Sequence, residues 1–157
     1  MNEYVACLNC KISANNAEEA KAQALVNLQI REASPTITMP LNVYERLKSI
    51  RGKTKEHLVV FLLNTQQEIL RQELVSLGIL DMSVVHAREV YRPAIAEGCA
   101  SVILAHNHPS GSTSPSDEDL SITRRLVKAG EIIGIKLLDH IIVSRQGYYS
   151  LKEHGQM

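Results

Sequence analysis

The sequence predicts a layered α/β domain. From Pro40 onward, apolar segments of strand length alternate with segments whose apolar residues recur at helical spacing, which is typical of α/β folds. Two of the strand-sized segments, residues 58–63 and 101–105, are almost continuously apolar, as expected of strands covered on both faces. With 157 residues, 45% apolar and 22% charged, the chain is long enough to bury a core of this kind.

The first 33 residues are interpreted as a separate small strand–helix unit. Residues 3–12 are compatible with a strand. Asn16 and Glu19 have the spacing of a capping box, so we expect a helix over residues 17–29. Residues 31–39 have no helical period and are interpreted as a connector to the main domain.

A helix and two strands follow the connector. Pro40 suits the first turn of a helix, whose apolar residues recur at helical spacing until Gly52 ends it. The apolar run at residues 58–63 predicts a buried strand. The polar turn at residues 64–67 leads into a second strand at residues 69–75, so we expect the two strands to form a hairpin.

The second half of the chain continues the alternation. In chain order we expect a short strand at 84–85, a helix over 88–97, a strand over 101–105, a helix over 116–129, a long strand over 135–143 and a short strand over 148–151. Gly130 is interpreted as the residue that ends its helix, because glycine commonly follows the last helical residue.

Charge and composition argue against several classes of function. Seventeen basic residues offset seventeen acidic ones, so no global positive field recruits nucleic acid. No apolar run approaches the roughly 20 residues needed to cross a bilayer, and the start of the chain does not resemble a secretory leader. Cys7 and Cys10 form a lone CxxC, for which a structural role is favoured over a zinc finger. We therefore expect a cytoplasmic protein that does not enter a membrane.

The strand over residues 101–105 leads into two histidines, a sharp loop and an acidic helix start. His106 and His108 are two residues apart, so in an extended strand they project to one face with Cα atoms roughly 6–7 Å apart. Imidazoles so placed can converge on one metal ion. Asp119, in the first turn of the next helix, can supply a third ligand, which leaves the fourth position of a tetrahedral zinc to water. The pattern predicts the open metal site of a hydrolase.

Each part of this pattern also has a structural interpretation. A histidine pair of this spacing can occur by chance in a chain with six histidines. Ser116 and Asp119 have the spacing of a helix capping pair, although a capped first turn is also a rigid place to mount a ligand. His140, among apolar strand residues, is either a neighbour of the metal ligands or a hydrogen-bonded strand histidine.

The combined spacing resembles that of a known family. His106-x-His108, seven residues and then Ser116-x-x-Asp119 is similar to the motif of JAMM/MPN metalloprotease domains. With the added string Leu-Asp-His-Ile-Ile-Val at residues 138–143, it resembles the bacterial RadC branch. The resemblance implies a three-layer α/β/α MPN (cytidine-deaminase-like) domain with a mixed β-sheet, to which the small N-terminal β-α unit is added.

The resemblance covers about three quarters of the chain. We expect the RadC-type domain to occupy residues 38–157, with residues 1–33 outside it. No match to the helix-hairpin-helix region of longer RadC proteins is found, so we expect a short form. Ala87 stands where the family commonly has proline, which affects a turn and not the site.

Roles for individual residues follow from the resemblance. It implies that His106, His108 and Asp119 bind a single Zn²⁺ per chain. It also implies that Ser116 donates a hydrogen bond to the developing oxyanion, which is electrostatic stabilisation of the transition state.

The family further requires a glutamate on an early strand, which acts as general base on the zinc-bound water. Glu56, at the start of the strand over residues 58–63, is our candidate. Glu68 and Glu73, on the neighbouring strand, are alternatives.

The resemblance implies a zinc-dependent metallohydrolase that cleaves a peptide or isopeptide bond in a protein or peptide substrate. A DNA-repair-associated accessory protein without peptidase activity is the alternative, although the net charge gives no support to nucleic-acid binding. An iron oxygenase with two histidines and one carboxylate, and a metal-free scaffold, are further alternatives.

Overall fold

The computed structural model describes residues 36–78 and 85–157. The predicted unit at residues 1–33, with Cys7 and Cys10, lies outside the described residues. Within them the elements are, in chain order, α2 (Pro40–Arg46), β1 (Glu56–Leu63), β2 (Ile69–Gly78), α3 (Ala87–Glu97), β3 (Ser101–Asn107), α4 (Asp117–Ile133), β4 (Lys136–Val143) and β5 (Tyr148–Ser150). The predicted α/β class and the predicted hairpin of the first two strands are confirmed.

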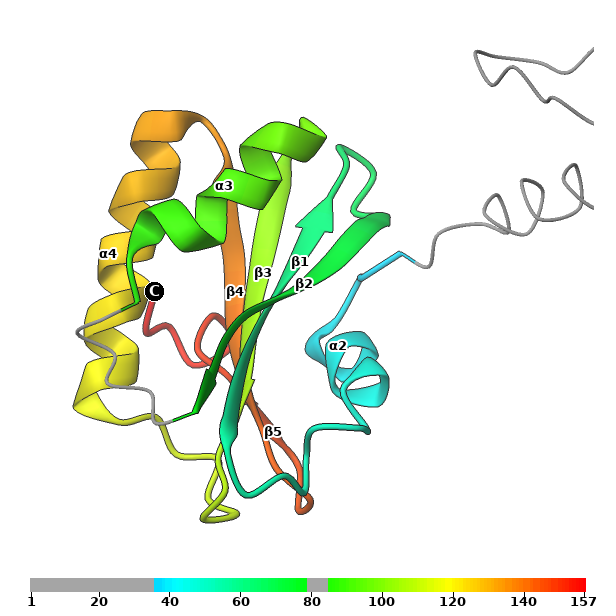
Figure 1. Ribbon diagram of the computed structural model, residues 1–157, viewed down its shortest axis with the longest axis vertical. Coiled ribbons are helices and arrows are strands. Elements are labelled where there is room, and N and C mark those ends of the chain that lie inside the picture. The colour runs from blue at the N-terminus through cyan, green and yellow to red at the C-terminus, as the bar shows by residue number, and fades with distance from the viewer. Residues whose placement is uncertain (1–35, 79–84) are drawn as a thin grey trace, which may run out of the picture. The chain divides into compact units, whose positions relative to one another are not determined.

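The described residues form one mixed five-stranded sheet in the order β2-β1-β3-β4-β5 (Figure 1). β1 pairs with β2 and with β3 in antiparallel fashion, and β4 pairs with β5 in the same way. Among the described strands only β3 and β4 run parallel, and the connection between them contains α4. The central strand β3 is buried along its whole length, which explains its almost continuously apolar sequence.

Helices cover both faces of the sheet, so the domain has three layers. α3 and α4 lie on one face and α2 lies on the other (Figure 1). Side chains of β1 alternate between the two cores: Leu58, Val60 and Leu62 face α3 and α4, whereas the intervening residues pack with α2. The same alternation along β3 places His106 on the α4 face and Asn107 on the α2 face. His106 therefore contacts Asp119 of α4, whereas Asn107 bonds the backbone at the start of β1.

A register shift in β4 changes which of its side chains reach the α4 face. Val102 pairs with Leu137, but the next residue of β3 pairs with Asp139, so Leu138 is skipped. Because side chains alternate along a strand, the skipped residue reverses the alternation and turns His140 toward the α4 face, beside His106. Asp139 is turned to the opposite face. There its carboxylate accepts hydrogen bonds from the backbone N–H groups of His140 and Lys152.

Three sequence-based expectations about the elements are wrong. The helix that begins at Pro40 ends at Arg46, with Leu47 as its C-cap, and does not continue to Gly52. Val85 is buried but is not part of a strand, and Val84 lies outside the described residues. Gly130 does not end its helix, which continues to Ile133 and is followed by Gly134 at φ 81°.

Close packing explains the glycine inside α4. A Cβ at Gly130 would lie 2.5 Å from the carbonyl oxygen of Ile135 and 2.5 Å from the hydroxyl of Tyr91. Only glycine lets the Ile135 carbonyl and the Tyr91 hydroxyl approach the helix backbone this closely. The residue that looks like a helix terminator in the sequence is therefore required for packing.

Among residues 36–78 and 85–157, no helix combines the length and apolar character that crossing a lipid bilayer requires.

Candidate metal centre

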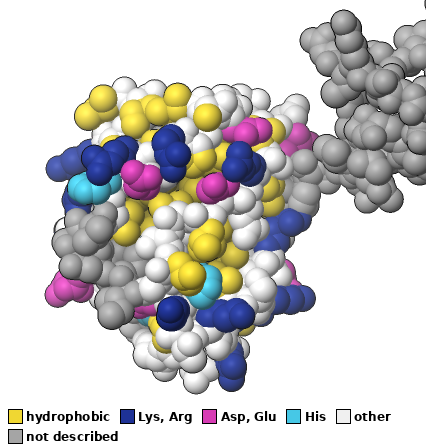
Figure 2. Space-filling view, viewed as in Figure 1, with side chains coloured by type: hydrophobic (Ala, Val, Ile, Leu, Met, Phe, Trp, Pro, Cys, Tyr) yellow, Lys and Arg dark blue, Asp and Glu magenta, His cyan; other side chains and the backbone are white. Residues whose placement is uncertain are grey.

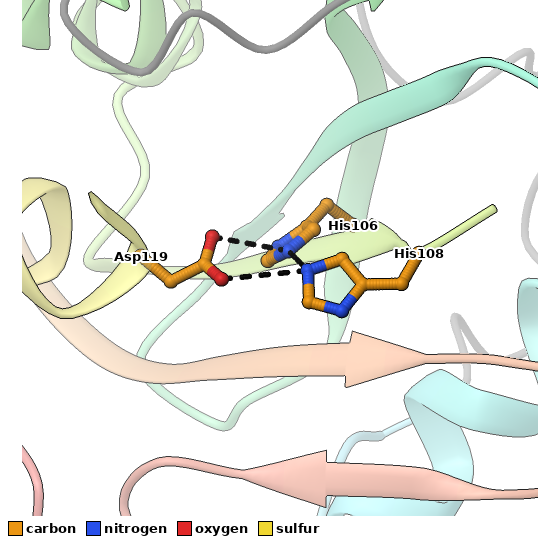
Figure 3. Close-up of side chains that lie close together, drawn as sticks. All are labelled: His106, His108 and Asp119. Carbon is orange, nitrogen blue, oxygen red and sulfur yellow. Dashed lines mark hydrogen bonds and ion pairs between the residues drawn. The ribbon is translucent and has the colours of Figure 1, made fainter. Parts of the chain in front are cut away.

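Three side chains from two elements converge at the end of β3. His106 is on the strand, His108 follows its last residue, and Asp119 lies in the first turn of α4. The Nε2 atoms of the two histidines are 2.9 Å apart. The carboxylate of Asp119 reaches both rings, with one oxygen 3.2 Å from His106 Nε2 and the other 3.4 Å from His108 Nε2 (Figure 3). Strand alternation and the helix start therefore bring these predicted residues together.

The first turn of α4 holds Asp119 in place. Ser116 is the N-cap, and its hydroxyl oxygen accepts a hydrogen bond from the backbone N–H of Asp119 at 3.1 Å. In return the carboxylate of Asp119 accepts hydrogen bonds from the backbone N–H and the hydroxyl of Ser116, at 2.8 and 2.7 Å. The capping function of the pair and its place in the site coexist, because the cap fixes the carboxylate that faces the histidines.

The spacing of the candidate ligand atoms, two imidazole nitrogens and the two oxygens of one carboxylate, fits a metal ion. Tetrahedral ligands about 2.0–2.1 Å from zinc lie about 3.3 Å from one another. The distances of 2.9, 3.2 and 3.4 Å among the two Nε2 atoms and the carboxylate oxygens of Asp119 bracket this value. His108 donates its Nδ1 hydrogen to the carbonyl of Ser112 at 3.0 Å, so its Nε2 offers a lone pair. Lone pairs that converge in this way are suited to binding a cation between them.

The charges of the group support cation binding. Burial alone would raise the pKa of Asp119, but its close contacts with His106 and His108 hold that pKa well below its usual range, so the carboxylate is ionised. The pKa of His108 is raised, first by its contact with Asp119 and to a smaller degree by the charge of Glu56. The side chain of His108 is 13% exposed, whereas those of His106 and Asp119 are almost fully buried. Solvent therefore reaches the site at His108.

His140 lies directly behind the site. Its Nε2 is 2.8 Å from His106 Nδ1, the ring nitrogen that faces away from Asp119, and its Nδ1 is 2.6 Å from the hydroxyl of Thr123. Burial holds the pKa of His140 well below its usual value, so this imidazole is neutral. Both interpretations left open for His140 hold, because it is a hydrogen-bonded histidine of strand β4 and it also contacts His106.

Glu56 lies at the same end of the sheet as the three residues. Leu58 is paired with His106 across the antiparallel β1–β3 ladder. Glu56 precedes Leu58 by two residues and His108 follows His106 by two, so strand alternation puts Glu56 on the face of the site at the level of His108. The charge of Glu56 contributes to the raised pKa of His108, which agrees with this position.

The two alternative glutamates lie elsewhere. Glu68 is at the hairpin end of β1, where its carboxylate accepts a hydrogen bond from the amide of Asn64 at 2.6 Å. Glu73 pairs with Val60 on the edge strand β2 and forms a 2.6 Å ion pair with Arg71. Neither residue is at the end of the sheet where His108 lies.

Asn107, between the two histidines, ties the start of β1 to β3. Its side-chain oxygen accepts a hydrogen bond from the backbone N–H of His57 at 2.8 Å. Its amide donates to the carbonyls of Lys55 and Lys53, at 3.2 and 3.4 Å. These bonds fix the backbone on both sides of Glu56.

Sequence reasoning missed the contributions of Asn107 and Thr123. A fully buried asparagine at the end of an apolar strand is a usable signal, because its amide must find partners in the interior. Thr123 could have been found as a hydroxyl four residues after Asp119 on the buried stripe of α4. Its partner His140 belongs to another element, so that contact has no signal in local spacing.

Comparisons with known proteins agree with this geometry. Residues 37–156 match the family model described as "RadC-like JAB domain". A "UPF0758 protein" of Rubrobacter xylanophilus is 50% identical over 124 residues, which is 78% of this chain and 54% of that protein. A "UPF0758 protein" of Methanosarcina mazei is 44% identical over 127 residues, covering 80% of this chain and 56% of the relative. The chain thus spans about half the length of the curated relatives it matches.

Proposed function

The chain belongs to the RadC-like JAB domain family, and on that basis we propose that it is a zinc-dependent metallohydrolase that cleaves a peptide or isopeptide bond. The observation that carries the proposal is the convergence of His106, His108 and Asp119 at ligand spacing, with Glu56 at the same end of the sheet. Three ligands leave one position of a tetrahedral ion for water, as in catalytic zinc sites.

The ligand residues set the charge of the site. His106 and His108 would hold the ion through imidazole lone pairs, which carry no net charge, and Asp119 would supply a single negative charge. Half of the formal charge of a divalent ion would therefore remain available to act on substrate. Zinc bound there supplies Lewis acidity, which lowers the pKa of a coordinated water and polarises the scissile carbonyl.

Glu56 acts as general base in this proposal. Its carboxylate takes a proton from the attacking water and passes it to the leaving amine. The bonds of Asn107 on both sides of Glu56 limit how far that carboxylate can move, and such positioning is itself a source of rate.

Ser116 supplies the hydrogen bond to the developing oxyanion. In the structure its hydroxyl donates to Asp119, so donation to substrate requires the O–H to rotate. The oxygen stays fixed during this rotation, because the N-cap bond from the Asp119 N–H holds it.

The other candidate functions have less support. Mononuclear iron oxygenases with two histidines and one carboxylate typically use an all-β jelly roll, whereas the described chain is a layered α/β domain. For a nucleic-acid accessory protein we expect a continuous basic surface. On the upper part of the face in Figure 2, basic and acidic side chains are intermingled. Among the described residues, Arg92 and Arg71 form ion pairs with Glu89 and Glu73.

A substrate screen with matched glutamate variants tests the proposal. Zinc-loaded wild type and its Glu56→Gln variant are incubated with a peptide library that includes isopeptide-linked members, and products are identified by mass spectrometry. We expect cleavage by wild type, and a loss of about 10²–10⁴-fold in Glu56→Gln with zinc retained. Glu68→Gln and Glu73→Gln are the controls and should cleave like wild type. Full activity of Glu56→Gln, or no cleavage by zinc-loaded wild type, would overturn the proposed function.

A further inference from the structure

A chain of buried hydrogen bonds runs from His106 to the backbone of Asp119. His106 Nδ1 is 2.8 Å from His140 Nε2, and His140 Nδ1 is 2.6 Å from the hydroxyl oxygen of Thr123. The Thr123 hydroxyl also lies 2.6 Å from the carbonyl oxygen of Asp119, one helical turn earlier. His106, His140 and Thr123 are fully buried, so water does not compete for these bonds.

The last member of the chain fixes the direction of every bond in it. A carbonyl oxygen can only accept, so the Thr123 hydroxyl donates its single hydrogen to Asp119. The oxygen of Thr123 then accepts the Nδ1 hydrogen of His140. Because a neutral imidazole carries one hydrogen, His140 Nε2 has only a lone pair, and it accepts the Nδ1 hydrogen of His106.

We propose that Thr123, acting through His140, is a positioning residue that fixes the tautomer of His106, so that the Nε2 lone pair of His106 faces the metal. The proposal rests on the metal site of the proposed function. A single hydrogen bond fixes the same tautomer in His108, because the Ser112 carbonyl accepts its Nδ1 hydrogen at 3.0 Å. Both histidines thus present Nε2, the atoms that lie 2.9 Å apart beside Asp119.

If the hydrogen bonds of this chain ran in the opposite direction, a hydrogen would occupy the metal-binding nitrogen of His106. If Thr123 donated to His140 Nδ1, the remaining hydrogen of His140 would sit on Nε2 and point at His106. The hydrogen of His106 would then have to sit on its own Nε2, where the metal binds. The Asp119 carbonyl prevents this arrangement, so the residue that supplies the carboxylate ligand also orients a histidine ligand through its backbone.

The tautomers can be measured directly. Long-range ¹H–¹⁵N correlation spectra of zinc-loaded wild type with ¹⁵N-labelled histidine should show hydrogens on Nδ1 of His106, His108 and His140. They should also show metal-bound Nε2 atoms in His106 and His108. A hydrogen on Nε2 of His140, or metal on Nδ1 of His106, overturns the proposal.

Two substitutions at Thr123 test whether the hydroxyl matters for affinity. Thr123→Val keeps the volume but removes the donor, and we expect it to bind zinc about 10–100-fold more weakly in chelator competition. Thr123→Ser keeps the donor and should bind zinc as wild type does. Circular dichroism shows whether each variant is folded, and if Thr123→Val is not, the wild-type spectra alone decide.

The outcomes separate this proposal from the proposed function. Zinc-loaded wild type with the expected tautomers but no hydrolysis refutes the peptidase and leaves the role of Thr123 standing. Wild type that binds zinc with the same affinity as a folded Thr123→Val variant refutes the role of Thr123 alone. Wild type that does not bind zinc refutes both.

Discussion

The side-chain oxygen of Asn107 accepts a hydrogen bond from the backbone N–H of His57 across 2.8 Å, which joins β3 to β1 at the metal centre. Asn107 lies between the two histidines in sequence but faces the opposite side of the sheet. It therefore cannot act on substrate itself. Its effect is to hold the backbone that carries Glu56, while its two sequence neighbours are proposed metal ligands.

Replacement of Asn107 should separate hydrolysis from metal binding. Asn107→Ala leaves the part-buried N–H of His57 and the carbonyls of Lys53 and Lys55 without their partner, which we expect to cost about 1–3 kcal/mol of the free energy of unfolding. Glu56 is then less well placed, so hydrolysis should fall while zinc binding is kept. Urea unfolding, zinc content and peptide cleavage measure the three quantities.

Asn64→Ala is the matched control for that variant. Asn64 ties the turn at the other end of β1, where its side-chain oxygen accepts from the N–H groups of Gln66 and Glu68. We expect Asn64→Ala to lower stability without a specific loss of hydrolysis. Equal losses of hydrolysis in the two variants would show that Asn107 acts only through stability.

Ser116→Ala should reduce both stability and catalysis. Loss of the N-cap bond to Asp119 is expected to cost about 1 kcal/mol of the free energy of unfolding. Loss of the donor to the oxyanion should lower kcat about 10²–10³-fold with zinc still bound. Ser116→Thr keeps the hydroxyl and should restore most of the stability. A Ser116→Ala enzyme with unchanged kcat would limit this residue to capping.

Gly130→Ala should destabilise the domain even though alanine favours helices. The gain in helix propensity is about 1 kcal/mol. Against it, the new Cβ would lie 2.5 Å from the backbone carbonyl of Ile135, which cannot move without the chain, and such overpacking costs about 1–3 kcal/mol. Urea unfolding measures the balance, and a more stable Gly130→Ala variant would contradict the packing role of this glycine.

Tyr91 should make stability depend on pH in the alkaline range. Burial raises its pKa from 10.0 to about 12, and its hydroxyl donates to the carbonyl of Leu126 at 2.8 Å. Between pH 10 and about pH 12 the Tyr91 hydroxyl is ionised in the unfolded chain but still protonated in the folded chain. The free energy of unfolding contributed by Tyr91 is therefore fully present below pH 10 and is lost as pH rises toward 12.

A comparison of wild type with Tyr91→Phe isolates this effect. Below pH 10 wild type should be more stable by about 1 kcal/mol, because only wild type makes the hydrogen bond. From pH 10 upward the difference should shrink. A difference that stays constant through this range would show that Tyr91 does not titrate as inferred.

Local patterns predicted the strands and the ligand spacing well. Residues 58–63 and 101–105 are apolar because both faces of β1 and β3 are covered by helices, so burial is visible in the sequence. The two histidines and Asp119 are also detectable, since strand alternation and the first turn of a helix fix their directions locally.

What the sequence could not predict depends on contacts between distant elements. In the sequence Gly130 looks like a helix end. Its role in packing is not visible there, because its close neighbours, Tyr91 and Ile135, lie outside its helix. His140 faces His106 only because β4 skips Leu138 in its pairing with β3. That irregularity arises from the register of two strands and leaves no local pattern.

Zinc stoichiometry tests the central claim most directly. The metal content of reconstituted protein is measured by elemental analysis for wild type, Asp119→Ala and Asp117→Ala, the last being an exposed aspartate in the same helical turn. We expect a single zinc per chain in wild type and Asp117→Ala, and none in Asp119→Ala. Wild type without zinc, or Asp119→Ala with as much zinc as Asp117→Ala, would contradict the assignment of this metal centre.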